Sequence, residues 1–152
     1  MRPLAALLFL ALAACGAPPA VESSQALTVE GAWAAPTPGG VEVSAGYLTI
    51  VNGTQEEDAL IGATSPRAER IEVHDMTMQD GVMQMRAMER LPLAPGESVE
   101  LAPGGRHLMF FGVTQPFAEG EQIPVRLSFE RAGEIDVALP VRRTAGGVHG
   151  AH

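Results

Sequence analysis

One histidine and four of the chain's seven methionines fall within twelve residues, in the segment HDMTMQDGVMQM from His74 to Met85. The Asp80-Gly81 dipeptide separates two alternating segments and predicts a β-hairpin, because both central residues of the favoured turn take positive φ. The expected cross-strand pairs are then Met78 with Met83, Met76 with Met85, and His74 with Ala87. Because side chains alternate along a strand, one side of the hairpin gathers His74, Met76, Met78, Met83 and Met85.

The opposite side of this hairpin has a different composition. It carries Ile71, Val73, Asp75, Thr77, Gln84, Arg86 and Met88. Its apolar members can supply the core, and Asp75 across from Arg86 predicts a cross-strand ion pair. Two alternatives to a ligand role stay open for the methionines, namely core filling and an adaptable apolar contact surface.

A second group with the same chemistry follows in GGRHLMFFGV. His107 and Met109 are two residues apart, so on a strand they share one side, while Leu108 and Phe110 take the other. Together with the hairpin they form a set of imidazoles and thioethers without a thiolate. Such soft neutral ligands select Cu(I) and are poor ligands for zinc, magnesium or calcium.

The spacing of these residues resembles a known signature. His74, ten residues, Met85, twenty-one residues and His107-Leu108-Met109 match the H(M)x10Mx21HxM motif of the periplasmic copper chaperones called PCuAC. Further similarity lies in Ala32-Trp33-Ala34, Ala45-Gly46-Tyr47-Leu48, Asp80-Gly81-Val82-Met83 and Pro103-Gly104-Gly105, over most of residues 27–141. The resemblance implies a cupredoxin-like β-sandwich that binds one Cu(I) through His74, Met85, His107 and Met109. It also implies delivery of that copper to the CuA centre of cytochrome c oxidase.

Several further residues have expected roles at this site or near it. Met76 occupies the optional methionine of the motif, and Met78 and Met83 can support the site. The tail histidines His149 and His152 are candidates for a separate Cu(II) site. We expect an exposed site near the hairpin tip, with Phe111 shielding the metal, and an affinity that falls as the imidazoles become protonated.

The ends of the chain predict export and anchoring. Residues 1–14 have the basic start, apolar run and small-residue end of a signal peptide. The Leu-Ala-Ala-Cys stretch ending at Cys15 resembles a bacterial lipoprotein cleavage box, so we expect Cys15 to be acylated and the protein to be tethered to a membrane in the periplasm. We then expect a tether at 15–26, the copper-binding domain at 27–143 and a tail at 144–152.

Short alternating or apolar segments between strong turn signals predict an all-β domain, an antiparallel β-sandwich of eight to nine strands. The segments are Leu27–Trp33, Gly46–Val51, Ala59–Ala63, Arg70–Met78, Val82–Leu91, Ser98–Leu101, His107–Val113, Ile123–Phe129 and Ile135–Val141. We expect Trp33 and Tyr47 to anchor the core, and Phe110 to point inward.

Composition excludes several function classes. Cys15 is the only cysteine, which argues against thiol chemistry and blue-copper electron transfer, and no G-x-S-x-G motif offers a nucleophile. The formal net charge of −8 and the lack of lysine argue against a nucleic-acid partner. The sequence therefore predicts a non-catalytic copper carrier. A lipid-anchored interaction module with a methionine-rich contact surface, or a copper-buffering or resistance protein, is the alternative.

Overall fold

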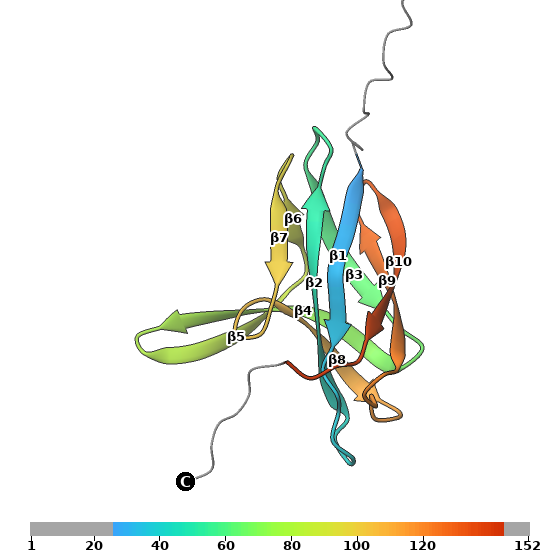
Figure 1. Cartoon of the computed structure of the whole chain (residues 1–152). Coiled ribbons are helices and arrows are strands. Elements are labelled where there is room, and N and C mark those ends of the chain that lie inside the picture. The colour runs from blue at the N-terminus through green and yellow to red at the C-terminus, as the bar shows by residue number, and fades with distance from the viewer. Residues whose placement is uncertain (1–25, 145–152) are drawn as a thin grey trace, which may run out of the picture.

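The computed structural model describes residues 26–144, and within that range every regular element is a strand (Figure 1). The ten strands are β1 (Leu27–Ala34), β2 (Val43–Asn52), β3 (Asp58–Thr64), β4 (Ala68–Gln79), β5 (Val82–Met88), β6 (Leu91–Leu93), β7 (Ser98–Leu101), β8 (His107–Val113), β9 (Gln122–Phe129) and β10 (Gly133–Pro140). No helix among these residues is long and apolar enough to cross a membrane.

The strands form one antiparallel sheet that curls until its two edges meet. Its order is β1-β2-β8-β4-β3-β9-β10, with β5, β6 and β7 joined to β4, β3 and β2. At the seam, where β1 and β10 lie side by side in Figure 1, Ala34 forms a parallel bridge with Val141. The backbone N–H of Arg142 also donates to the carbonyl of Ala34 at 3.1 Å. The predicted all-β antiparallel fold is confirmed, with ten strands in place of the expected eight or nine.

Alternation along each strand directs apolar side chains into the interior of the curled sheet. Leu48 and Ile50 of β2 are almost completely buried, as are Leu108 and Phe110 of β8. The ring of Phe110 packs edge-on against Phe117, with centroids 5.3 Å apart. The inward position predicted for Phe110 is therefore confirmed. Its neighbours on the strand, Met109 and Phe111, point to the outer side of the sheet.

Trp33 and Tyr47 do not anchor the core, and that prediction is wrong. Both side chains are only half-buried, and their ring centroids lie 4.4 Å apart across the β1–β2 pair. Tyr47 precedes the buried Leu48, so alternation sends its ring to the outer side of the sheet. Trp33 is directly opposite Tyr47 on β1, so its ring lies on the same outer side. The guanidinium of Arg142 covers the outer aromatic pair, 5.2 Å from the Trp33 ring centroid.

The β4–β5 hairpin projects from the body of the protein (Figure 1). Up to His74, β4 is flanked by β8, but residues 75–79 pair with β5 alone. Asp80 and Gly81 have φ angles of 51° and 77°, as the predicted two-residue turn requires. We call residues 75–86, which form the projecting part of this hairpin, the arm.

The expected segment Val82–Leu91 is two strands and not one. β5 ends at Met88 because its pairing with β4 ends there, and the chain then crosses to β3 to form β6. At the crossing, Arg90 donates hydrogen bonds to Glu130 and Glu57. Leu91 and Leu93 are buried beside β3, so burial of these leucines fixes the second pairing.

Candidate metal centre

The predicted ligands lie on three neighbouring strands, with β4 in the middle. His74 is directly opposite His107 of β8 on one side and Ala87 of β5 on the other. Met85 lies opposite Met76, two pairs further along the arm and next on the same face, as the predicted register requires. Because opposite residues of an antiparallel pair project to the same side, His74, Met85, His107 and Met109 all face the outer side of the sheet.

The two histidines come together at the base of the arm. Their ring centroids are 5.8 Å apart, and the rings are inclined at 50°. His107 is only 5% exposed, and the His74 side chain is 12% exposed. The site is thus less exposed than expected, because His74 and His107 form the last pair of the β4–β8 ladder and not part of the hairpin tip.

Hydrogen bonds determine which nitrogen of each ring is free. Nε2 of His74 lies 2.8 Å from Oε2 of Glu72, and Nδ1 of His107 lies 3.0 Å from the carbonyl oxygen of Gly105. A carboxylate and a carbonyl only accept, so each of these ring nitrogens donates a proton. In the neutral form of each ring, the lone pair then resides on Nδ1 of His74 and on Nε2 of His107. Nδ1 of His74 is buried and has no hydrogen-bond partner within residues 26–144, as expected of a nitrogen kept for a ligand.

Glu72 is a site residue that the sequence interpretation missed. Its other oxygen, Oε1, accepts a hydrogen bond from Nε of Arg70 at 2.6 Å. The hydrogen bond from His74 holds the pKa of Glu72 below its ordinary value, Arg70 acts in the same direction, and desolvation opposes both. Glu72 therefore stays ionised near neutral pH. Its place two residues before His74 on the same strand face was the available signal.

An aromatic ring closes one side of the histidine pair. The Phe111 ring centroid lies 5.8 Å from that of His74, and the Arg70 guanidinium covers Phe111 at 4.4 Å. Arg70 thus contacts both Glu72 and Phe111 and links the two groups that pack against His74. The predicted position of Phe111 beside the site agrees with this arrangement.

Thioethers are essential to any metal site here. Within residues 26–144, no cluster of three or more His, Cys, Asp or Glu side chains could hold a metal ion. Met109 is half-buried opposite Glu72, and Met85 is 48% exposed on β5. Two neutral imidazoles with two thioethers form a soft donor set, suited to Cu(I) and not to hard cations.

The remaining predicted residues fall into two groups. The supporting methionines Met76, Met78 and Met83 lie on the same face of the arm. Met76 is directly opposite Met85, and only Met78 and Met83 lie further from the histidines, toward the turn. Cys15, His149 and His152 lie outside the described residues.

The predicted ion pair between Asp75 and Arg86 does not form. Asp75 is opposite Arg86, but its carboxylate pairs with Arg106 at 3.6 Å, and Arg86 instead donates to Gln84. Arg106 directly precedes β8, so the β4–β8 pairing brings it beside the arm.

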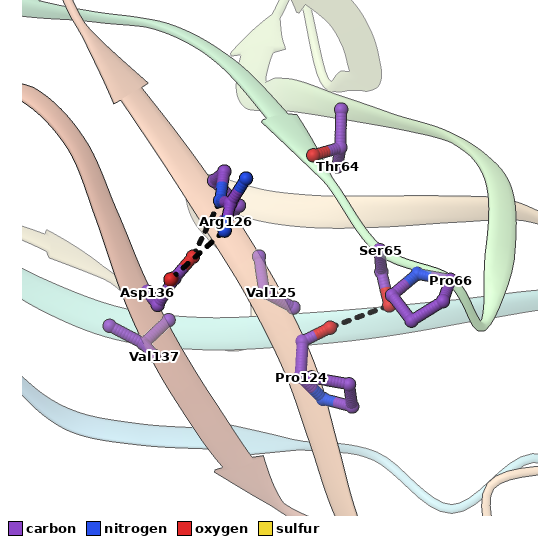
Figure 2. Close-up of a pocket in the computed structure, with 8 residues that line it drawn as sticks. All are labelled: Thr64, Ser65, Pro66, Pro124, Val125, Arg126, Asp136 and Val137. Carbon is purple, nitrogen blue, oxygen red and sulfur yellow. Dashed lines mark hydrogen bonds and ion pairs between the residues drawn. The ribbon is translucent and has the colours of Figure 1, made fainter.

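A cavity of about 590 Å³ lies elsewhere, between the β3–β4 turn and strands β9 and β10 (Figure 2). Its charged groups pair with each other, since Arg126 lies 2.7 Å from Asp136, and Ser65 donates to the carbonyl of Pro124. None of the residues lining it is a predicted ligand. The candidate centre is therefore the strand face at the base of the arm and not this cavity.

The fold and donor set define an all-β domain of the PCuAC type. The copper-bound PCuAC domain from PmoF2 has the same fold, with a TM-score of 0.66 at 24% identity over 76% of this chain and 92% of that chain. DR1885 from Deinococcus radiodurans is similar as the apo protein, with a TM-score of 0.61 at 26% identity over 95% of this chain and 97% of that chain. Its CuI form gives a TM-score of 0.57 at 25% identity over 76% and 77%.

The LpqE-like family, described as "Putative lipoprotein LpqE-like", matches residues 27–141, and the chain belongs to this family. A relative named "Putative lipoprotein Lxx21020", from Leifsonia xyli subsp. xyli (strain CTCB07), is 30% identical over 108 residues, or 70% of this chain. The chain spans 65% of that relative's length, slightly less than two thirds. The resemblance to PCuAC domains noted in the motif is confirmed by the fold and the family.

Proposed function

We propose that this protein is a non-catalytic Cu(I) chaperone that holds one ion between His74, Met85, His107 and Met109. The observation that carries the proposal is the buried, unpartnered Nδ1 of His74, directly across β4 and β8 from His107. The CuI form of DR1885 and the copper-bound domain of PmoF2 support copper as the metal. Copper is cargo here, since a chaperone must release what it binds.

The proposed ligands differ in exposure, as a copper carrier requires: the histidines are nearly buried, and Met85 is exposed. The histidines are nearly buried and held by hydrogen bonds to Glu72 and Gly105, so they provide a prepared half-site. The thioether of Met85 comes from the exposed arm and is neutral at every pH. An incoming ligand from an acceptor can therefore displace Met85 without moving the body of the protein.

The second part of the proposal concerns where the protein acts and which protein receives the copper. The protein is proposed to be anchored to a membrane in the periplasm through acylated Cys15, in keeping with the lipoprotein description of the family. The CuA centre of cytochrome c oxidase is the proposed recipient. His149 and His152 are proposed to bind Cu(II) separately.

An anaerobic Cu(I) titration of the full-length protein against a chromophoric chelator tests the central proposal. We expect one tightly bound equivalent, and a large loss of affinity in His74→Ala and His107→Ala. If the native protein fails to compete with the chelator, the proposed function is wrong.

A residue exchange on the arm provides a sharper variant. Gln84→Met/Met85→Gln keeps the composition and moves one thioether to the opposite face of β5, because adjacent residues alternate. We expect it to lose affinity, whereas Met88→Leu should not, since Met88 packs against the core. Native affinity in the exchanged variant would remove Met85 from the ligand set.

A further inference from the structure

The arm continues the methionine face beyond the proposed copper site. Two cross-strand pairs, Met76–Met85 and Met78–Met83, follow the His74–Ala87 pair toward the turn. Exposure rises in the same direction, because Met76 is half-buried while Met83 and Met78 are 50% and 66% exposed. The methionines thus form a continuous line from the nearly buried histidines to solvent.

Hairpin geometry places the members of each pair close together. Gln79 and Val82 flank the two-residue turn, so they form a hydrogen-bonded pair. Pairs alternate along an antiparallel ladder, which makes both methionine pairs non-hydrogen-bonded, with Cα atoms about 4.5 Å apart. Successive methionine pairs are two residues apart, or about 7 Å along the strand. Long flexible thioether side chains can bridge such a spacing.

The chemistry of this face is more specific than packing requires. No core covers the outer methionines. Apart from the exposed Val82, the other side of the arm is polar, with Asp75, Thr77, Gln84 and Arg86. Leucine and valine also provide apolar contact area, but only methionine adds a soft sulfur donor. All four arm methionines lie on one face, and that face is the face of His74.

We propose that Met78 and Met83 form a second, outer Cu(I) site, and that the ion passes between it and the histidine pair through Met76 and Met85. The inference rests on the proposed function, because it requires Cu(I) as the cargo. Each step exchanges one thioether for another, or a thioether for an imidazole lone pair. The ion remains Cu(I), and no electron or proton is transferred.

Methionine methyl NMR of the full-length protein, labelled with ¹³C at the Cε positions, tests this inference. Under anaerobic titration with Cu(I), the first equivalent should shift Met85 and Met109, and further copper should shift Met78 and Met83. Met88 should not move, because it lies on the opposite face. The Met78→Leu/Met83→Leu variant should keep the first binding event, lose the second, and transfer copper to a chelator more slowly than the native protein.

The matched control is Met88→Leu, which removes one thioether outside the line and should bind and transfer as the native protein does. If Met85 and Met109 shift but Met78 and Met83 stay unchanged in excess copper, the outer site is wrong and the proposed function stands. If no arm or β8 methionine shifts, both fall. Native transfer rates in the Met78→Leu/Met83→Leu variant would show that this face is an apolar contact surface and overturn the proposed passage.

Discussion

Replacing Glu72 with alanine should weaken copper binding, although Glu72 is not a proposed ligand. Its carboxylate accepts the Nε2 proton of His74 at 2.8 Å and so leaves the lone pair on Nδ1. Alanine removes this acceptor. The His74 ring is then free to rotate and to carry its proton on Nδ1, where it would block binding. The Glu72→Gln variant retains a neutral oxygen that can still accept this hydrogen bond.

The size of the effect follows from the role of Glu72 as an orienting partner. Loss of a group that orients a metal-binding histidine usually lowers affinity about 10- to 100-fold, or about 1.4 to 2.7 kcal/mol. We expect Glu72→Ala to fall in this range because His74 has no other hydrogen-bond partner through Nε2. Glu72→Gln should lie between the native protein and Glu72→Ala, since it keeps the acceptor but loses the charge.

Competition with a Cu(I) chelator measures the affinity, and ¹H–¹⁵N NMR of the His74 ring measures the tautomer. A merely structural role for Glu72 would change unfolding but not the tautomer. Glu100→Ala, an exposed carboxylate on β7, is the control and should bind copper as the native protein does. Affinity in Glu72→Ala within twofold of native, with an unchanged tautomer, would refute this reasoning.

Two further predictions concern the scaffold. Gly46→Ala should destabilise the protein by about 1 to 3 kcal/mol in urea unfolding. The new Cβ would lie 2.8 Å from Cε2 of Phe110 and 2.9 Å from Cδ2 of Leu139. Unchanged stability would mean that these side chains shift freely. Asp58→Ala should cost about 2 to 4 kcal/mol at pH 7, since the buried carboxylate accepts the backbone N–H groups of Ala59, Arg131 and Ala132. Burial raises the pKa of Asp58, but these three hydrogen bonds together lower it by more. The net effect is a pKa below the ordinary value. The stabilisation by Asp58 should therefore be complete above the unfolded-state pKa and should disappear as the pH falls through the lower folded-state pKa. Equal stability of the native protein and the Asp58→Ala variant at pH 7 would contradict this prediction.

The features of this structure that could be predicted are those determined by residues close together in the sequence. The Asp80-Gly81 turn alone sets the register of the arm, because a two-residue hairpin allows one pairing of its flanking strands. Strict alternation then places His74 and Met85 on a common face. The same alternation sends Phe110 inward, since the position of a side chain relative to its strand neighbours is a local property.

The parts that could not be predicted depend on which strands become neighbours. Asp75 pairs with Arg106 and not with Arg86 because β8 brings Arg106 beside the arm. The β5–β6 break depends in the same way on β3, which captures Leu91. Glu72 was missed for another reason: its alignment with His74 follows from the strand, but its hydrogen bond depends on side-chain rotamers.

The proposed site joins a fixed half and an exposed half, and this determines the order of events in release. His107 is part of the body, and its Nδ1 proton is held by the carbonyl of Gly105. Phe111 closes one side of His74, whereas the arm side is lined by exposed thioethers. An acceptor that approaches along the arm meets Met85 before either imidazole. The first exchange should therefore replace a thioether, and the histidines should release the ion last, which keeps Cu(I) bound until the acceptor has engaged it.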